Sequence, residues 1–264
     1  MVTLLGLPWD GSSSFERGAA AAPPRIRAAL RSPSSNAFNE RGDDVLDPDV
    51  LTDGGDLTLP SDAAAARGAI EQGVRRILER ASKPLLLGGD HSVTYPVLRA
   101  FREQAGALTV LHLDAHGDIY DDFQGDRFSH ACPFARVMEE QLAVRLVQVG
   151  LRTLTPHQRA QSSRFGTEII GADRWRDALP VVASFRGPVY VSLDLDVLEP
   201  MLAPGLSHPE PGGLSVRDVL ELLAALRTHV AGADIVEYNP RRDFGDLTAR
   251  VAAKFLKELV GLMR

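Results

Sequence analysis

Two aspartate-rich segments of the chain could supply the ligands of a metal site. Leu113–Asp118 reads Leu-Asp-Ala-His-Gly-Asp, and Ser192–Asp196 reads Ser-Leu-Asp-Leu-Asp. Each directly follows or ends a short apolar run typical of a buried strand, so its acidic residues fall where a parallel strand leaves the sheet. Because successive side chains of an extended strand alternate faces, residues two apart project as a pair that can hold a cation. These pairs are Asp114 with His116, and Asp194 with Asp196.

A third segment, Leu85–Ser92, repeats this arrangement. An apolar run is followed by two glycines and then by His91 at the start of the next element. Taken singly, an aspartate or histidine at a strand end is more often a helix cap or a turn former. Taken together, these residues have no common structural explanation, because clustered carboxylates without a cation repel one another strongly. The candidate metal ligands are therefore His91, Asp114, His116, Asp118, Asp194 and Asp196.

Length and composition predict one globular domain over residues 1–264. The net charge of −6 argues against a nucleic-acid-binding protein and suits a small cationic partner. No apolar stretch is long enough to span a membrane, so no membrane partner is expected. Met1–Leu7 shows no leader pattern, and the single cysteine, Cys132, is interpreted as a buried hydrophobic residue that forbids an internal disulfide. Both features predict a cytoplasmic location.

Strand-like runs alternate with helical patterns, which predicts βαβ units and a mainly parallel sheet. The predicted strands are Val2–Leu7, Pro84–Leu87, Leu108–Leu113, Val144–Val149, Glu168–Ile170, Val189–Leu195 and Ile235–Glu237. The predicted helices include Asp62–Ala81, Phe128–Gln141, Ser215–Val230 and Leu247–Leu262. Ser215 with Asp218 three residues later indicates a capping box at a helix start. Long loops are expected over Arg31–Gly55 and over Pro200–Gly213, the second of which should wall the site.

These motifs resemble those of the ureohydrolases, the family of arginases and agmatinases. Gly88–Ser92, Asp114–Asp118 and Ser192–Asp196 match its three metal-binding motifs in order and spacing, and the similarity runs over nearly the whole chain. The plant-type arginase branch looks closest. It shares Asp118–Asp121, Phe128–Ala131, Gln148–Gly150 and Glu210–Asp218. The resemblance implies a three-layer α/β/α sandwich around a mainly parallel sheet, usually assembled as homo-oligomeric trimers or hexamers.

The resemblance further implies two Mn²⁺ ions per chain. One ion would be held by His91, Asp114, Asp118 and Asp194, and the other by His116, Asp114, Asp194 and Asp196. Imidazole and carboxylate ligands without a thiolate suit Mn²⁺ better than structural zinc. Glu199 departs from the family, which commonly has aspartate before Pro200. That position is not normally a ligand, so we expect adjustment around the site and retention of the metal.

Three residues receive catalytic roles from the same resemblance. Glu237 matches the glutamate that pairs with a guanidinium group, and His130 matches a histidine that exchanges protons with solvent. Asp118 would carry a proton from the attacking water, which the metals acidify, to the leaving amine. Without the motif, Glu237 would be interpreted as a surface residue at a strand end and His130 as the start of a helix. The other histidines have weaker claims, with His112 expected to be buried or behind the ligands.

The favoured function is hydrolysis of a guanidino compound to urea and an amine, with L-arginine to L-ornithine first, agmatine to putrescine second, and other guanidino acids open. The segment Tyr120–Ser129, or a contact across subunits, should meet the α-carboxylate that distinguishes arginine. Arg127 could bind this carboxylate, whereas Asp121, Asp122 and Asp126 would repel it and attract an amine. Two alternatives from other classes are a metal-dependent deacetylase with one ion, which metal stoichiometry would separate, and a non-catalytic binding protein on the same fold.

Overall fold

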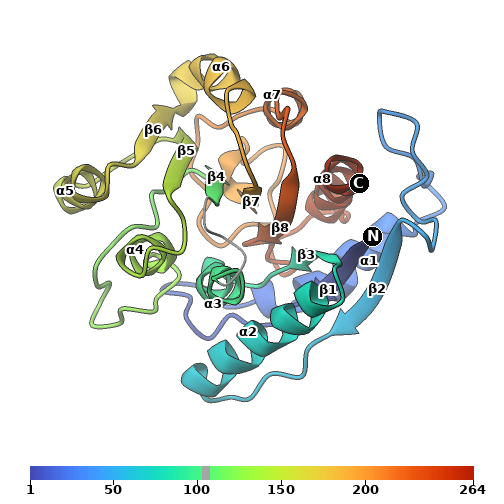
Figure 1. The fold of residues 1–264 in the computed structure, drawn as a ribbon, viewed down its shortest axis with the longest axis horizontal. Helices are drawn as coiled ribbons and strands as arrows, with labels where there is room; N and C mark the ends of the chain where they lie inside the picture. The colour runs from blue at the N-terminus through green and yellow to red at the C-terminus, as the bar shows by residue number, and fades with distance from the viewer. Residues whose placement is uncertain (103–107) are drawn as a thin grey trace.

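One parallel sheet organises the chain in a computed structural model that describes residues 1–102 and 108–264. The sheet has eight strands in the order β2-β1-β3-β8-β7-β4-β5-β6, and the pairings between them are parallel (Figure 1). The strands are β1 (Val2–Gly6), β2 (Leu51–Asp56), β3 (Lys83–Leu87), β4 (Thr109–Leu113), β5 (Arg145–Leu151), β6 (Glu168–Gly171), β7 (Val189–Asp194) and β8 (Val230–Val236). The α/β class with a parallel sheet is confirmed.

Helices cover both faces of this sheet (Figure 1). They are α1 (Ala22–Leu30), α2 (Ala63–Glu79), α3 (Thr94–Ala100), α4 (Pro133–Glu139), α5 (Pro156–Phe165), α6 (Ala178–Ala183), α7 (Val216–Ala224) and α8 (Leu247–Met263). Buried side chains of α1, α6, α7 and α8 share one apolar cluster with the strands, and those of α2, α3 and α4 share a second. Alternation along β4 feeds both clusters, because Leu111 and Leu113 belong to the first and Val110 to the second.

The predicted strands all overlap observed ones, but three boundaries differ from the prediction by more than two residues, and one strand was not predicted. β2 lies at the end of the predicted loop Arg31–Gly55. It was missed because its sequence is rich in aspartate and glycine, and only Leu51 of this edge strand is buried. β8 begins at Val230, so the preceding helix, predicted to reach that residue, ends at Ala224.

The third boundary concerns the helix predicted to begin at Phe128. α4 begins at Pro133, whose lack of a backbone N–H suits the first helical position. The residues before it form turns that place His130 at the site. The capping box predicted from Ser215 and Asp218 is present at the start of α7, and Asp62 caps α2. Among the described residues, no helix is long and apolar enough to cross a membrane.

The order of the central strands explains where the candidate residues meet. β3, β8, β7 and β4 are adjacent, and their carboxyl ends lie at the same edge because the strands are parallel. His91 follows β3, Glu237 follows β8, Asp194 ends β7, and Asp114 follows β4. The loop that connects β7 to α7 borders this edge, as predicted for Pro200–Gly213.

Candidate metal centre and active-site cavity

The structure brings the six predicted ligands together in two overlapping groups. The ligand atoms within each group lie within 4.8 Å of one another. The groups are His91, Asp114, Asp118 and Asp194, and Asp114, His116 and Asp196. The first group is the complete set expected for one ion. The second lacks only Asp194 of the set expected for the other ion, and Asp114 belongs to both.

His91 tests whether this arrangement fits a cation. Its Nδ1 atom is buried and lies 3.1 Å from one carboxylate oxygen of each of three aspartates, yet it forms no hydrogen bond. The three aspartates are Asp114, Asp118 and Asp194. A nitrogen that faces three carboxylates without bonding to any of them occupies the position of a ligand. The residues therefore fit a metal ion between them.

The contacts of His91 Nε2 explain why Nδ1 is the nitrogen that faces the carboxylate cluster. Its Nε2 atom lies 2.9 Å from Ser192 Oγ, and the Ser192 hydroxyl donates to Asp234 at 2.7 Å. Asp234 is fully buried and also accepts hydrogen bonds from the hydroxyls of Tyr190, at 2.7 Å, and Thr94, at 2.8 Å. Because the Ser192 proton points to Asp234, its oxygen is free to accept the Nε2 proton. Nδ1 can then present a lone pair to a cation.

His112 supports the shared ligand Asp114. Its Nε2 atom lies 2.6 Å from Asp114 Oδ2, and its Nδ1 atom faces the Gln148 amide nitrogen at 2.9 Å. Since the amide nitrogen can only donate, Nδ1 accepts and Nε2 donates to Asp114. Burial lowers the pKa of His112, which is fully buried, so the neutral imidazole is favoured. His112 thus lies behind the ligands, as the sequence predicted.

The electrostatics of the cluster also suit a divalent cation. Burial, and then the neighbouring carboxylates of Asp196 and Asp114, raise the pKa of Asp194 well above its ordinary range. Burial and the Asp114 carboxylate likewise raise the pKa of Asp196 to about 6. A cation between these groups would replace this repulsion with attraction. Carboxylate and imidazole donors without a thiolate are the set that a hard ion prefers.

Glu237 lies beside the cluster, and only one of its two carboxylate oxygens is held by hydrogen bonds within the protein. Oε1 lies 2.7 Å from the donating backbone N–H of His91 and 2.9 Å from His130 Nδ1. Oε2 has no hydrogen-bond partner among the described residues, and the side chain lines the cavity. Burial lowers the pKa of His130, but the Glu237 carboxylate outweighs this effect and raises it to about 9. On its other side, His130 Nε2 lies 2.8 Å from Ser14 Oγ.

Two of these residues adopt a backbone conformation that side chains disfavour. Glu237 has φ of 64° and Asp118 has φ of 43°, both in the left-handed region. Such a conformation costs on the order of 1–3 kcal/mol and persists only where the surrounding structure enforces it. At Glu237, the backbone N–H donates to the Gly89 carbonyl at 2.8 Å. The fold therefore holds both carboxylates in the site at some cost in stability.

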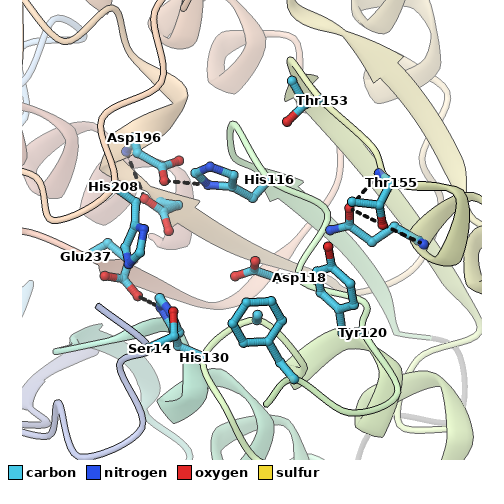
Figure 2. Close-up of a pocket in the computed structure, with 14 residues that line it drawn as sticks. Ser14, His116, Asp118, Tyr120, His130, Thr153, Thr155, Asp196, His208 and Glu237 are labelled. Carbon is cyan, nitrogen blue, oxygen red and sulfur yellow. Dashed lines mark hydrogen bonds and ion pairs between the residues drawn. The ribbon is translucent and has the colours of Figure 1, made fainter. Parts of the chain in front are cut away.

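A cavity of about 230 Å³ lies over the centre (Figure 2). Its inner wall carries the charged residues His116, Asp118, Asp194, Asp196 and Glu237. Its outer wall, opposite Glu237, carries Tyr120, Thr153 and Thr155. Gln158, hydrogen-bonded to Thr155, and Phe123, whose ring lies 5.1 Å from that of Tyr120, line the cavity beside them. His208, from the loop Pro200–Gly213, also lines the cavity, which confirms that this loop walls the site.

Several cavity residues were not predicted. His208 had only a weak claim from the sequence, and the structure places its ring 5.1 Å from that of His130. Thr155 and Gln158 were not considered, although the pattern Thr-x-x-Gln before a helix is a recognisable capping-box signal. Ser192 and Asp234, which lie behind His91 and outside the cavity, carry no such signal, because their contact arises only when β7 pairs with β8.

Arg127 and Asp121, predicted to contact substrate, do not line the cavity. Arg127 lies 3.3 Å from Asp121 and 3.0 Å from Glu139, and Asp121 also pairs with Arg136 at 3.0 Å. Their charges are thus balanced by near neighbours along the chain. The structure does not bring Arg127 to the position where a substrate carboxylate could meet it.

Glu199, the departure from the family pattern, is accommodated near the site. Its carboxylate accepts hydrogen bonds from the backbone N–H groups of Gly212, at 2.8 Å, and Gly213, at 3.0 Å. It therefore closes the loop between β7 and α7 and is not part of either ligand group. Cys132 is buried and free, as predicted, and burial raises its pKa to about 12.

Comparison with known proteins identifies close relatives. The model of the Arginase family matches residues 1–261. "Arginase 1, mitochondrial" of Arabidopsis thaliana is 46% identical over 97% of this chain and 79% of its own length. The solved arginase of Medicago truncatula has a TM-score of 0.94 and 42% identity, with 99% of this chain and 87% of that chain covered. A hypothetical agmatinase of Burkholderia thailandensis has a TM-score of 0.89 and 31% identity, with coverages of 99% and 85%.

The comparisons overturn the predicted cytoplasmic location. The plant arginases that are 44–46% identical are named mitochondrial, or chloroplastic and mitochondrial, and not cytoplasmic. The prediction was based on the first residues and on the cysteine content. Neither feature reports the compartment, because the fold and its chemistry are compatible with any reducing environment.

Proposed function

This chain belongs to the arginase family, and we propose that it hydrolyses L-arginine to L-ornithine and urea with two Mn²⁺ ions per chain. The observation that carries the proposal is the set of carboxylates around the unbonded His91 Nδ1, with the free Glu237 oxygen beside them. Identity of 44–46% to plant arginases, against 31% to the hypothetical agmatinase, favours arginine over agmatine. These relatives are named as arginases and an agmatinase, which disfavours the deacetylase alternative.

Each catalytic residue has a distinct task in this proposal. When bound, the metal pair would act as a Lewis acid and lower the pKa of the attacking water. Oε2 of Glu237 would pair with the cationic guanidinium and hold its carbon beside the cluster. An Asp118 carboxylate oxygen would take up the proton of the water and pass it to the leaving amine. His130, which Glu237 keeps protonated near neutral pH, would exchange protons with solvent through the cavity.

We also propose that residues 1–264 form one domain and assemble as a homo-oligomer, a trimer or a hexamer. The shared sheet and the family match to residues 1–261 support the single domain. Resemblance to the family supports the assembly. Sedimentation of the purified chain would measure its mass, and a monomer at all concentrations would contradict the assembly.

A urea-release panel tests the activity. Mn²⁺-loaded protein should release urea from arginine faster than from agmatine or from shorter guanidino acids, and elemental analysis should find two manganese ions per chain. His91→Ala should lose metal and activity together, whereas Asp121→Asn, outside the ligand groups, should lose neither. A single tightly bound zinc, with no gain from manganese, would favour the deacetylase alternative instead.

A further inference from the structure

The outer wall of the cavity differs from the inner wall in charge. Figure 2 shows Tyr120, Thr153 and Thr155 across the cavity from Glu237. The outer wall has hydroxyl, amide and aromatic groups but no carboxylate, whereas the carboxylates that line the cavity all belong to the inner wall. An ammonium group at the far end of a substrate would therefore meet no anion there, and of arginine and agmatine only arginine carries a carboxylate beside that ammonium. Groups that accept hydrogen bonds would be better matched.

Gln158 supplies a hydrogen-bond donor whose orientation is determined by the start of α5. Its Oε1 atom accepts hydrogen bonds from the Thr155 backbone N–H, at 2.9 Å, and from the Thr155 hydroxyl, at 3.2 Å. Because a backbone N–H can only donate, the amide oxygen must face Thr155 and the NH₂ group must face the other way. The capping box therefore sets the amide orientation.

The NH₂ group of Gln158, on the side of the amide away from Thr155, has no hydrogen-bond partner among the described residues. Gln158 is only 5% exposed and lines the cavity. Nε2 lies beside Gly117, in the turn between His116 and Asp118: a Cβ added at Gly117 would be 3.5 Å from it. A nearly buried donor without a partner is costly unless a ligand or water satisfies it.

The helix itself adds a second preference for an anion. α5 has ten residues and begins at the cavity, and no acidic residue occupies its first turn. The positive end of the helix dipole is thus left without a carboxylate from its own first turn. Asp121, the nearby acid, is paired with Arg136 and Arg127 outside the cavity.

We infer that Gln158, at the N-terminus of α5, binds the α-carboxylate of the amino-acid substrate and thereby selects arginine over agmatine, an inference that rests on the proposed function. The guanidinium lies against Glu237 on the inner wall, and the carboxylate accepts from Gln158 Nε2 on the outer wall. The Tyr120 and Thr153 hydroxyls flank the same wall. Agmatine has no carboxylate and leaves Nε2 unpaired. An unpaired donor in the site weakens the binding of agmatine relative to arginine.

Gln158→Glu tests this inference with little change of shape. A glutamate at this position still completes the capping box, because its carboxylate accepts from the Thr155 N–H. It replaces the donor that faces the cavity with an anion. We expect kcat/KM for arginine to fall about 10- to 100-fold, mainly through KM, as expected for the loss of a hydrogen bond to a charged group. Agmatine should be affected much less, so the arginine-to-agmatine ratio of kcat/KM should fall by a similar factor.

Binding of the products provides a readout without turnover. Calorimetry on the Mn²⁺-loaded protein should show that Gln158→Glu weakens ornithine binding and affects putrescine much less. Gln158→Met removes the donor without adding charge. It should lower the arginine-to-agmatine ratio of kcat/KM and the ornithine-to-putrescine ratio of affinities, each by a smaller factor than Gln158→Glu does. Arg127→Ala is the matched control, because this exposed cation lies outside the cavity, and it should leave both ratios unchanged. The thermal midpoint of each variant checks that it is folded.

The outcomes separate the inference from the proposed function. Equal losses for arginine and agmatine in Gln158→Glu, or an unchanged ratio, would overturn the role of Gln158 while leaving urea release in place. A fall in the arginine-to-agmatine ratio of kcat/KM in Arg127→Ala would show that Arg127 binds the carboxylate. If the wild type released no urea from either substrate, the proposed function would fail, and the ornithine and putrescine titrations would still decide whether Gln158 binds a carboxylate.

Discussion

Glu237→Gln separates substrate orientation from metal binding, because the two oxygens of Glu237 have different tasks. Both internal hydrogen bonds, from the His91 N–H and from His130, go to Oε1. A glutamine can keep its own oxygen in that position and satisfy both donors. Its NH₂ group then occupies the place of Oε2 in the cavity. The variant therefore preserves the packing and changes one cavity atom from an anionic acceptor to a donor.

The size of the effect follows from this exchange. A hydrogen bond to a charged group contributes about 1.5–3 kcal/mol, and every 1.4 kcal/mol corresponds to a factor of about ten. The new N–H groups also point at the N–H groups of a cationic guanidinium, which adds an unfavourable contact. We therefore expect kcat/KM for arginine to fall by about two orders of magnitude or more, similar to the loss of one preorganised electrostatic partner.

The assay is urea release together with elemental analysis of the same samples. Manganese content should match the wild type, because Glu237 belongs to neither ligand group. Arg127→Ala, a charge change outside the cavity, serves as the control. Near-full kcat/KM with unchanged metal content would show that another anion holds the guanidinium, and the placement of the substrate against Glu237 would be wrong.

Three further predictions concern the centre and its support. Asp196→Asn should lower manganese occupancy and urea release together, as measured on one sample; full occupancy would remove Asp196 from the ligands. Asp234→Asn should weaken manganese affinity about 10- to 100-fold in a metal titration, because it disturbs the Ser192 contact that orients His91, while Thr94→Val should cost less. Burial lowers the pKa of His130, but Glu237 outweighs this effect and raises it to about 9. The charged pair therefore stabilises the fold fully below the ordinary histidine pKa of 6.5. This stabilisation is lost as the pH rises through about 9. The difference in unfolding free energy between the wild type and Glu237→Gln should accordingly narrow from pH 6.5 to 10, and a constant difference would contradict the pair.

The cluster of candidate metal ligands could be predicted because each of its residues has a local signal. Asp114 and Asp194 stand at the ends of buried apolar runs, and parallel strands end at one edge. The same reasoning placed Glu237 at the end of β8, although the start of that strand was missed. Its first half contains Ala231 and Gly232, which give little strand signal, and Gly232 is required because a Cβ there would lie 2.7 Å from the Phe101 ring.

The residues that sequence reasoning missed depend on contacts between distant elements. Asp234 meets Ser192 only because the two residues are register partners in adjacent strands. By charge alone, Arg127 suits a carboxylate, but Asp121 and Glu139 lie close along the chain and pair with it instead. The direction of the Gln158 amide depends on the cap geometry of α5, which no count of charges reveals.

Because of the strand order of the sheet, the two walls of the cavity come from different parts of the chain. The candidate metal ligands and Glu237 lie at the ends of β3, β4, β7 and β8, while Thr153, Thr155 and Gln158 follow β5, the next strand outward from β4. If this wall selects the substrate as we infer, substitutions after β5 alter which molecule is accepted without touching the candidate metal ligands. A fold with this separation can diversify its substrates by exchanging one loop and helix start, and a designer could graft new selectivity there while leaving the reactive centre intact.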